Sequence, residues 1–169
     1  MKTIKTILCA IVMMCACMNA QAQDRLNAIG FNYGYMVGSN DVTNFGIGIK
    51  YDRFLSEALR VEANGTYYFK QEKNHTNWYD LNANFHYLFN VAEKTNVYPI
   101  FGFTTMFGHT SFEAGGVKVS DTCARFGCNT GAGAQYNITE DFGVTFEAKY
   151  KIVKDFGNFN IALGCVVLF

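Results

Sequence analysis

The end of the chain alternates between apolar side chains and smaller or more polar ones. Every second residue from Phe159 to Phe169 is apolar, whereas Asn160, Ala162 and Gly164 stand at positions between them. A period of two is typical of a β-strand with two unlike faces. The pattern therefore predicts that the chain ends in a strand whose last residue is aromatic.

Seven further segments alternate in the same way. The eight predicted strands are 28–37, 45–54, 59–70, 78–89, 97–108, 123–136, 142–152 and 159–169. The connections between them are short, and strands joined by short connections are neighbours in an up-and-down sheet. The sequence therefore predicts an all-β fold, an eight-stranded antiparallel up-and-down β-barrel. The longest predicted loop is 109–122.

The beginning of the chain is typical of an export signal. Lys2 and Lys5 are followed by the uncharged apolar run 7–18 and by the small-x-small sequence that ends at Ala22. These features predict a cleavable signal peptide over residues 1–22. The run is too short for a helix that spans a membrane.

Cleavage at this site leaves one barrel domain, residues 23–169, and two alternatives stay open. They are an uncleaved N-terminal anchor and a lipid attached to Cys17. Removing two of the 14 basic residues leaves 12 against 14 acidic ones. This balance, with no basic block, gives no indication of a nucleic-acid partner.

The distribution of charge and glycine indicates which face of each strand points inward. On the apolar face Arg53 is the only charged residue and sits at a strand end, and the tyrosines lie toward strand ends. Both features are typical of a surface that meets lipid. The other face is rich in glycine and in charges of both signs, which suits a crowded barrel interior. The predicted lumen charge network is Lys50, Asp52, Arg60, Glu62, Asp80, Arg125, Glu147, Lys149 and Lys151, with Lys70 on the same face.

Four pieces of sequence resemble a known family. They are the segments 97–102, 130–136 and 146–150, together with the terminal Phe169. In order and spacing the chain resembles the small outer-membrane β-barrels of Gram-negative bacteria, namely the OmpA-type transmembrane barrel and its OmpX-like and opacity-like relatives in the porin family.

The resemblance implies a location in the outer membrane, with the lipid bilayer as surroundings and a periplasmic N-terminus. It also implies that the outer-membrane assembly machinery recognises the terminal strand through Phe169. The chain departs from the OmpA pattern because its outward loops are short and no peptidoglycan-binding domain follows.

The sequence does not indicate catalysis, and it predicts neither cofactor nor metal. The three histidines are scattered, so metal binding with Cys123 or Cys128 is disfavoured. Carboxylates on the polar face are interpreted as salt-bridge partners, because no nucleophile and base stand in a spacing that suggests a catalytic pair. With Cys165, three cysteines remain after cleavage, and their redox state stays open.

We therefore expect an integral outer-membrane protein with a lumen filled by side chains and with a structural or surface-interaction role. The predicted loop 109–122 is the candidate contact with an extracellular partner, since binding often resides in loops. Two alternatives remain, a narrow channel for small solutes or ions and a soluble periplasmic barrel that binds ligands as lipocalins do.

Overall fold

The computed structural model describes the whole chain except residues 1–25, 39–42, 70–75, 115–116 and 155. The described residues form nine antiparallel strands. They are β1 (Asn27–Gly38), β2 (Thr43–Phe54), β3 (Leu59–Tyr68), β4 (Thr76–Tyr87), β5 (Phe89–Ala92), β6 (Thr95–Ala114), β7 (Val117–Asn137), β8 (Phe142–Val153) and β9 (Phe156–Leu168). No helix in the described part of the chain is long and apolar enough to cross a membrane. The predicted signal peptide, residues 1–22, lies outside the described residues.

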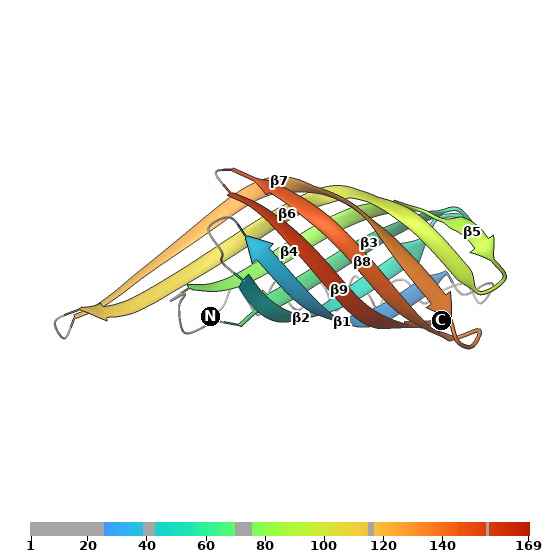
Figure 1. Ribbon diagram of the computed structural model, residues 1–169, viewed down its shortest axis with the longest axis horizontal. Coiled ribbons are helices and arrows are strands. Elements are labelled where there is room, and N and C mark those ends of the chain that lie inside the picture. The colour runs from blue at the N-terminus through green and yellow to red at the C-terminus, as the bar shows by residue number, and fades with distance from the viewer. Residues whose placement is uncertain (1–25, 39–42, 70–75, 115–116, 155) are drawn as a thin grey trace.

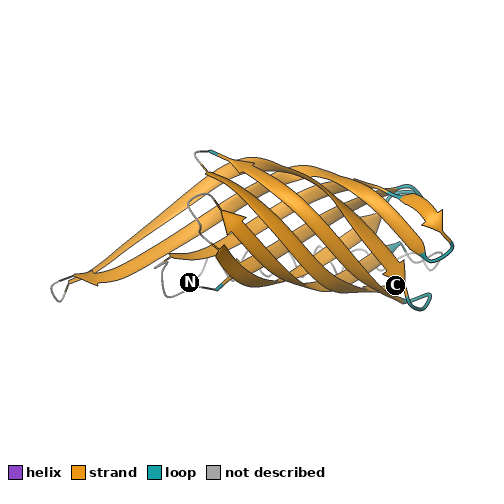
Figure 2. Cartoon of the chain, in the orientation of Figure 1, coloured by secondary structure: helices purple, strands orange, loops and turns teal. Residues whose placement is uncertain are grey.

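The strands close into a barrel. Each of the eight long strands pairs with its neighbours in sequence, β1 pairs with β9, and the pairing of β4 with β6 closes the ring. The short strand β5 adds only three paired positions at the edge of β6. Figure 2 shows strands wrapping obliquely around one axis. The prediction of an eight-stranded antiparallel up-and-down barrel is confirmed.

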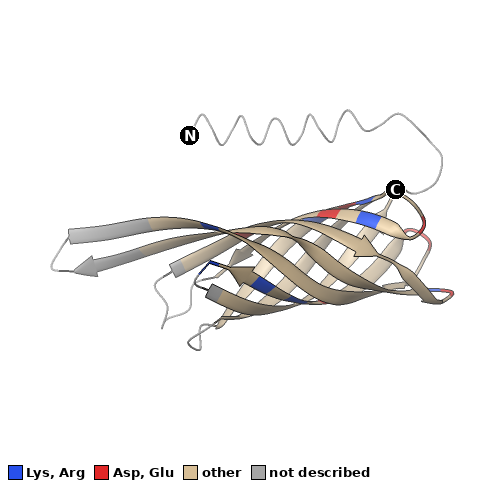
Figure 3. Ribbon diagram, turned by 90° about the horizontal axis from the view of Figure 1, so that it is seen from above, with Lys and Arg blue, Asp and Glu red and all other residues tan. Residues whose placement is uncertain are grey.

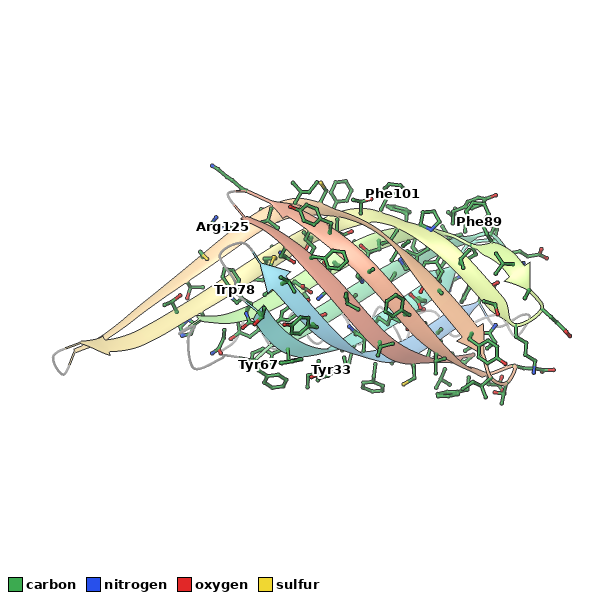
Figure 4. The ribbon with its side chains drawn as sticks, in the orientation of Figure 1. Tyr33, Tyr67, Trp78, Phe89, Phe101 and Arg125 are labelled. Atoms are coloured by element: carbon green, nitrogen blue, oxygen red, sulfur yellow. The ribbon has the colours of Figure 1, made fainter. Side chains whose placement is uncertain are left out.

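The side chains face as the sequence predicted, with apolar groups outside and charged groups inside. Phe103 and Phe126 on the outer face are 70% and 77% exposed, whereas Asp52 and Arg60 on the inner face are 0% exposed. Figure 4 shows Tyr33 and Phe101 projecting away from the barrel. This arrangement is the reverse of a water-soluble barrel and matches one whose wall meets hydrocarbon.

The prediction of a loop at 109–122 is wrong. Strands β6 and β7 continue to pair through this region, from His109↔Thr122 to Ala114↔Val117. The pairing of β4 with β6 stops at Thr110 and that of β8 with β7 begins at Gly127, so the two strands extend past the barrel wall as a hairpin. Figure 1 shows this hairpin projecting beyond the other strands.

The hairpin and the chain terminus lie at opposite ends of the barrel. The backbone N–H of Asn27 donates to the carbonyl of Phe169 at 3.1 Å, which places the start of β1 beside the end of β9. The short turns 55–58 and 138–141 lie at this end, because they join strands that start or finish there. The chain between the predicted strands 78–89 and 97–108 includes most of the short strand β5, which the sequence analysis did not anticipate.

Candidate functional site

Charged side chains from opposite walls meet in the interior of the barrel. Lys50 and Asp52 are two residues apart on β2, and Glu147 and Lys149 are two residues apart on β8. All four side chains are buried, so they point to the inner side of the wall. An eight-stranded barrel is just wide enough for its own side chains to fill it. Residues that are 97 positions apart, such as Lys50 and Glu147, therefore come into direct contact. Figure 3 shows basic and acidic positions on neighbouring strands of the barrel body.

The centre of the network alternates two ammonium groups with two carboxylates. Lys50 Nζ donates to Glu147 Oε1 at 2.7 Å, and Lys149 Nζ donates to Glu147 Oε2 at 2.7 Å. Glu62 lies 3.4 Å from Lys50 Nζ and 3.9 Å from Lys149 Nζ. Asn84 Nδ2 also donates to Glu62 Oε1 at 2.6 Å. We call Lys50, Glu62, Glu147 and Lys149 the central quartet.

Arg60 forms a second layer, nearer to the end that carries Phe169. Its Nη1 donates to Gln135 Oε1 at 2.7 Å and lies 3.8 Å from Asp52 Oδ2. Its Nε donates to His86 Nδ1 at 3.0 Å, and its guanidinium carbon lies 4.5 Å from the centroid of the Tyr98 ring. The guanidinium thus combines hydrogen bonds, an ion pair and a cation–π contact, as its planar shape allows.

Asp80 and Lys151 form a third layer toward the hairpin end. Lys151 Nζ pairs with Asp80 Oδ2 and lies 3.3 Å from the Tyr68 hydroxyl. Asn82 Nδ2 donates to Asp80 Oδ1 at 2.7 Å. Between this pair and the central quartet lies a belt of amides, in which Asn82 Nδ2 donates to Asn64 Oδ1 at 3.0 Å.

The three layers balance in charge. They hold four basic groups, Lys50, Arg60, Lys149 and Lys151, against four acidic groups, Asp52, Glu62, Asp80 and Glu147, all buried. Buried charges are costly unless they are paired and hydrogen-bonded, and removing one partner typically destabilises a protein by about 3–5 kcal/mol. Each of these eight groups therefore depends on its partners, because the loss of one leaves an opposite charge buried and unpaired.

Arg125, the ninth residue of the predicted network, lies apart from these layers. Its Nη1 donates to the backbone carbonyl of Lys154 at 2.8 Å. Arg125 precedes Gly127, where β7 begins to pair with β8, so it belongs to the stretch of β7 beyond the end of β8. Figure 4 shows it at the hairpin side of the barrel, which corrects the prediction. Lys70 lies outside the described residues.

Apolar clusters flank the charged layers at both ends. Toward the hairpin, Met36, Tyr68, Met106 and Val153 pack together with Trp78 against them. Toward the terminus, Leu88, Tyr98 and Ile100 pack together with Phe54. We call these the hairpin-side cluster and the terminus-side cluster. Apolar side chains therefore pack against one another at both ends of the described lumen.

The interior holds one group of potential metal ligands among the described residues. Ligand atoms of Asp52, Glu62 and His86 lie within 4.8 Å of one another. However, His86 Nδ1 accepts a hydrogen bond from Arg60, so Nε2 carries the ring proton and has no lone pair for a metal. Arg60 and Lys50 already balance the two carboxylates. The chemistry of this group fits an ion-pair network and does not fit a metal centre.

The three cysteines of the described chain are free thiols. Cys128 is exposed on the outer face of β7, whereas Cys123 lies on its other face opposite Gly108 and is half-buried. An extended strand keeps these two side chains on opposite faces, where they cannot form a disulfide. Cys165 lies on β9, beside Phe31 of β1 and Val144 of β8.

Several interior residues escaped the sequence analysis. Tyr98 donates from its hydroxyl to Glu147 Oε1 at 3.1 Å and stacks on His86 with ring centroids 4.8 Å apart. Gln135 accepts from Arg60. The sequence could have indicated these residues only by their position, because each stands at one of the alternate positions of its strand that face inward. A tyrosine or histidine in that set was not distinguished from its neighbours by residue type alone.

A closed sheet of eight strands, apolar outside and ion-paired inside, defines a transmembrane β-barrel. The sequence also matches the model of one family, described as the outer membrane protein beta-barrel domain, over residues 7–169. The chain belongs to this family and is a protein of the bacterial outer membrane. The alternative of a soluble periplasmic barrel is therefore wrong.

Solved structures show the same fold. Ail, the attachment invasion locus protein of Yersinia pestis, matches with a TM-score of 0.62 and 17% identity, covering 85% of this chain and 96% of Ail. Neisserial surface protein A matches with a TM-score of 0.62 and 19% identity over 85% of this chain and 97% of its own. The N-terminal barrel of Pseudomonas aeruginosa OprF has a TM-score of 0.56 and 15% identity, over 84% and 97% of the two chains. Comparison with curated protein sequences gives no match.

Proposed function

We propose that this protein is a rigid, non-enzymatic scaffold of the outer membrane that presents the β6–β7 hairpin to a partner outside the cell. One observation carries the proposal: β6 and β7 remain paired to Ala114↔Val117, which is 4 residues past the last pair of β6 with β4 and 10 residues past the last pair of β7 with β8. A membrane barrel needs only enough strand to cross the bilayer, about 9–11 residues, whereas β6 has 20 and β7 has 21.

The interior supports the scaffold role. Each ionisable group of the central quartet lies within 4 Å of an opposite charge and is buried. A catalytic acid or base must be accessible to a substrate. A narrow channel is disfavoured for a related reason, because the hairpin-side and terminus-side clusters place packed apolar side chains at both ends of the described lumen.

The charge of the hairpin-side end bears on what the partner is. In sequence, the segments between β1 and β2, between β3 and β4 and between β8 and β9, together with residues 111–126, hold five basic residues (Lys70, Lys73, Lys118, Arg125, Lys154) and five acidic residues (Asp41, Glu72, Glu113, Asp121, Asp155). Ail was solved with the heparin analogue sucrose octasulfate. A polyanion of that kind prefers a basic patch, so this balance favours a protein partner over a sulfated polysaccharide.

The test uses a variant with a shortened hairpin. Removing residues 111–114 and 117–120 joins the paired residues Thr110 and Asp121 through the native Gly115-Gly116. Bacteria that display this variant should adhere several-fold less to an epithelial cell layer than bacteria that display the wild type. The matched control is Glu57→Ala in the turn at the other end of the barrel. Equal adhesion of the shortened and wild-type proteins, at equal surface levels, would contradict the proposal.

Export and assembly complete the proposal. Phe169 is 57% exposed on the outer face, and its N–H donates to Asn27 O at 2.8 Å, so the last residue belongs to the seam that closes the barrel. We expect deletion of Phe169 to slow delivery to the outer membrane through loss of recognition by the assembly machinery. Intact-mass measurement of the mature protein should give a chain that starts at Gln23 if residues 1–22 are the signal peptide.

A further inference from the structure

The outer wall carries a groove where one side chain is missing. Phe31, Ile49, Gly65 and Leu81 stand in one row of paired positions across β1, β2, β3 and β4. Phe31, Ile49 and Leu81 are 60–63% exposed, whereas glycine leaves a gap on β3. The resulting groove has a volume of about 480 Å³. This volume is within the range of roughly 300–1,000 Å³ for sites that bind small molecules.

The neighbouring rows give the groove a direction. On the hairpin side, Tyr67 and Tyr79 face each other across β3 and β4, with ring centroids 5.2 Å apart, and both line the groove. On the terminus side, the paired residues are Ala63 and Ala83, which add only a methyl group each. The outer surface is therefore high at the tyrosines and low from Gly65 toward the alanines.

We propose that this groove binds one acyl chain of a membrane lipid, with the lipid headgroup at the tyrosine end. The groove is continuous with the wall that the hydrocarbon of the membrane covers, so an acyl chain is already beside it. The side chains that face outward along it are all aromatic or aliphatic, namely Phe31, Ile47, Ile49, Tyr67, Tyr79 and Leu81. Tyrosine is an amphipathic side chain that favours the boundary between lipid and water, where its hydroxyl donates to polar oxygens.

The acyl chain binds at the groove because of the shape of the groove, and not because the groove is more apolar than the rest of the wall. Lipid tails are as apolar as leucine side chains, so a chain gains little by leaving its neighbours for the protein. It does gain van der Waals contacts on three sides, from Ile49, Leu81 and the floor at Gly65, where a flat wall offers contact on one side. We therefore expect the wild-type groove to hold a lipid about fivefold more often than a groove that an added side chain fills.

The test compares two substitutions that add the same side chain to the outer face. Gly65→Leu fills the groove, and a Cβ atom there meets first the end of the flexible Leu81 side chain, at 3.3 Å. Ala132→Leu adds a leucine to the outer face of β7, away from the groove. Each full-length protein is purified in a non-ionic detergent, mixed with dipalmitoyl phosphatidylethanolamine, and analysed by native mass spectrometry. Migration of unboiled protein on a detergent gel confirms that each barrel is folded.

The wild type and Ala132→Leu should each retain one lipid after detergent washing, and Gly65→Leu should retain about fivefold less. Leu81→Ala removes one wall of the groove and should also lower retention, which keeps the test decisive if Gly65→Leu does not fold. Equal lipid retention in all four proteins would overturn the proposal. So would a wild-type dimer that Gly65→Leu converts to monomer, because a second copy would then occupy the groove. Neither result depends on what the hairpin binds.

Discussion

The projecting hairpin continues two of the eight long strands of the barrel body, β6 and β7, but the two regions are held together by different interactions. Within the body, β6 and β7 each have a second neighbour, β4 or β8, and their inner side chains contact the charged layers. Beyond Thr110 and Gly127 the pairs between β6 and β7 alone continue the sheet. A lone two-stranded hairpin is only marginally stable in water. The body therefore stabilises the fold, and the hairpin draws its stability from the body.

The largest loss of stability should come from removing Glu147, the carboxylate at the centre of the barrel body. Glu147→Ala leaves Lys50 and Lys149 without their closest carboxylate, at 2.7 Å each. An uncompensated buried charge costs about 3–5 kcal/mol, so the free energy of unfolding should fall by that order. Urea titration of the barrel in lipid vesicles, followed by the fluorescence of Trp78, measures the loss.

Glu57→Ala is the control for that measurement. Glu57 is exposed in the turn after β2, so its removal should change the unfolding free energy by no more than about 0.5 kcal/mol. If Glu147→Ala and Glu57→Ala unfold at the same urea concentration, the interior does not depend on this carboxylate.

A smaller effect should follow from replacing both members of the third layer. Asp80→Ala alone leaves Lys151 as a buried cation and should cost about 3 kcal/mol. Adding Lys151→Met removes that cation, so the double variant should recover at least about 1 kcal/mol, since a buried pair often contributes little net stability over apolar residues. A double-mutant cycle in lipid vesicles measures the coupling. Strictly additive losses would show that the two side chains do not act as a pair.

Substitutions on the outer face of the body should change the free energy of unfolding by a similar or smaller amount. Phe103 is 70% exposed near the middle of β6, and Phe89 is 51% exposed near the terminus-side rim. Arginine at the bilayer midplane costs about 2–4 kcal/mol, and near the interface about 0–1 kcal/mol. Phe103→Arg should therefore destabilise the barrel in vesicles much more than Phe89→Arg. Equal losses would mean that depth in the membrane does not distinguish the two positions.

The sequence predicts features that depend on neighbouring residues, and it does not predict contacts between residues that are far apart in the chain. Alternation is a property of each strand alone, so the eight strands and the inward set with Lys50 and Glu147 could be read directly. The contact between those two residues depends on ring closure, which joins positions 97 apart. A local pattern carries no information about that pairing.

The errors have a related cause. Alternation places Arg125 on the inner face of β7 but does not show that β8 ends before reaching it. The hairpin was missed because its alternation is short, with only Phe112 and Ala114 before the turn and Val117 and Val119 after it. The Gly115-Gly116 pair, a sequence typical of a two-residue hairpin turn, was the signal that the segment was a hairpin.

The smallest expected effect comes from shortening the hairpin. The variant that joins Thr110 to Asp121 through Gly115-Gly116 removes four paired positions, from Ser111↔Ser120 to Ala114↔Val117. On the backbone, these positions pair only between β6 and β7 among the described strand pairs, since the pairing of β4 with β6 stops at Thr110 and that of β8 with β7 begins at Gly127. The free energy of unfolding in vesicles should therefore change by no more than about 0.5 kcal/mol, although eight residues are lost.

This outcome separates two explanations of the extra strand length. If the hairpin served the barrel by completing the sheet, its removal would lower stability toward the value of the Asp80→Ala variant, and the shortened barrel would unfold at a lower urea concentration. If it serves contact outside the cell, stability stays and adhesion falls, because the strand pairs removed lie beyond the last described pairs of β6 with β4 and of β7 with β8. Measuring both properties on one purified variant distinguishes a structural extension from a binding one.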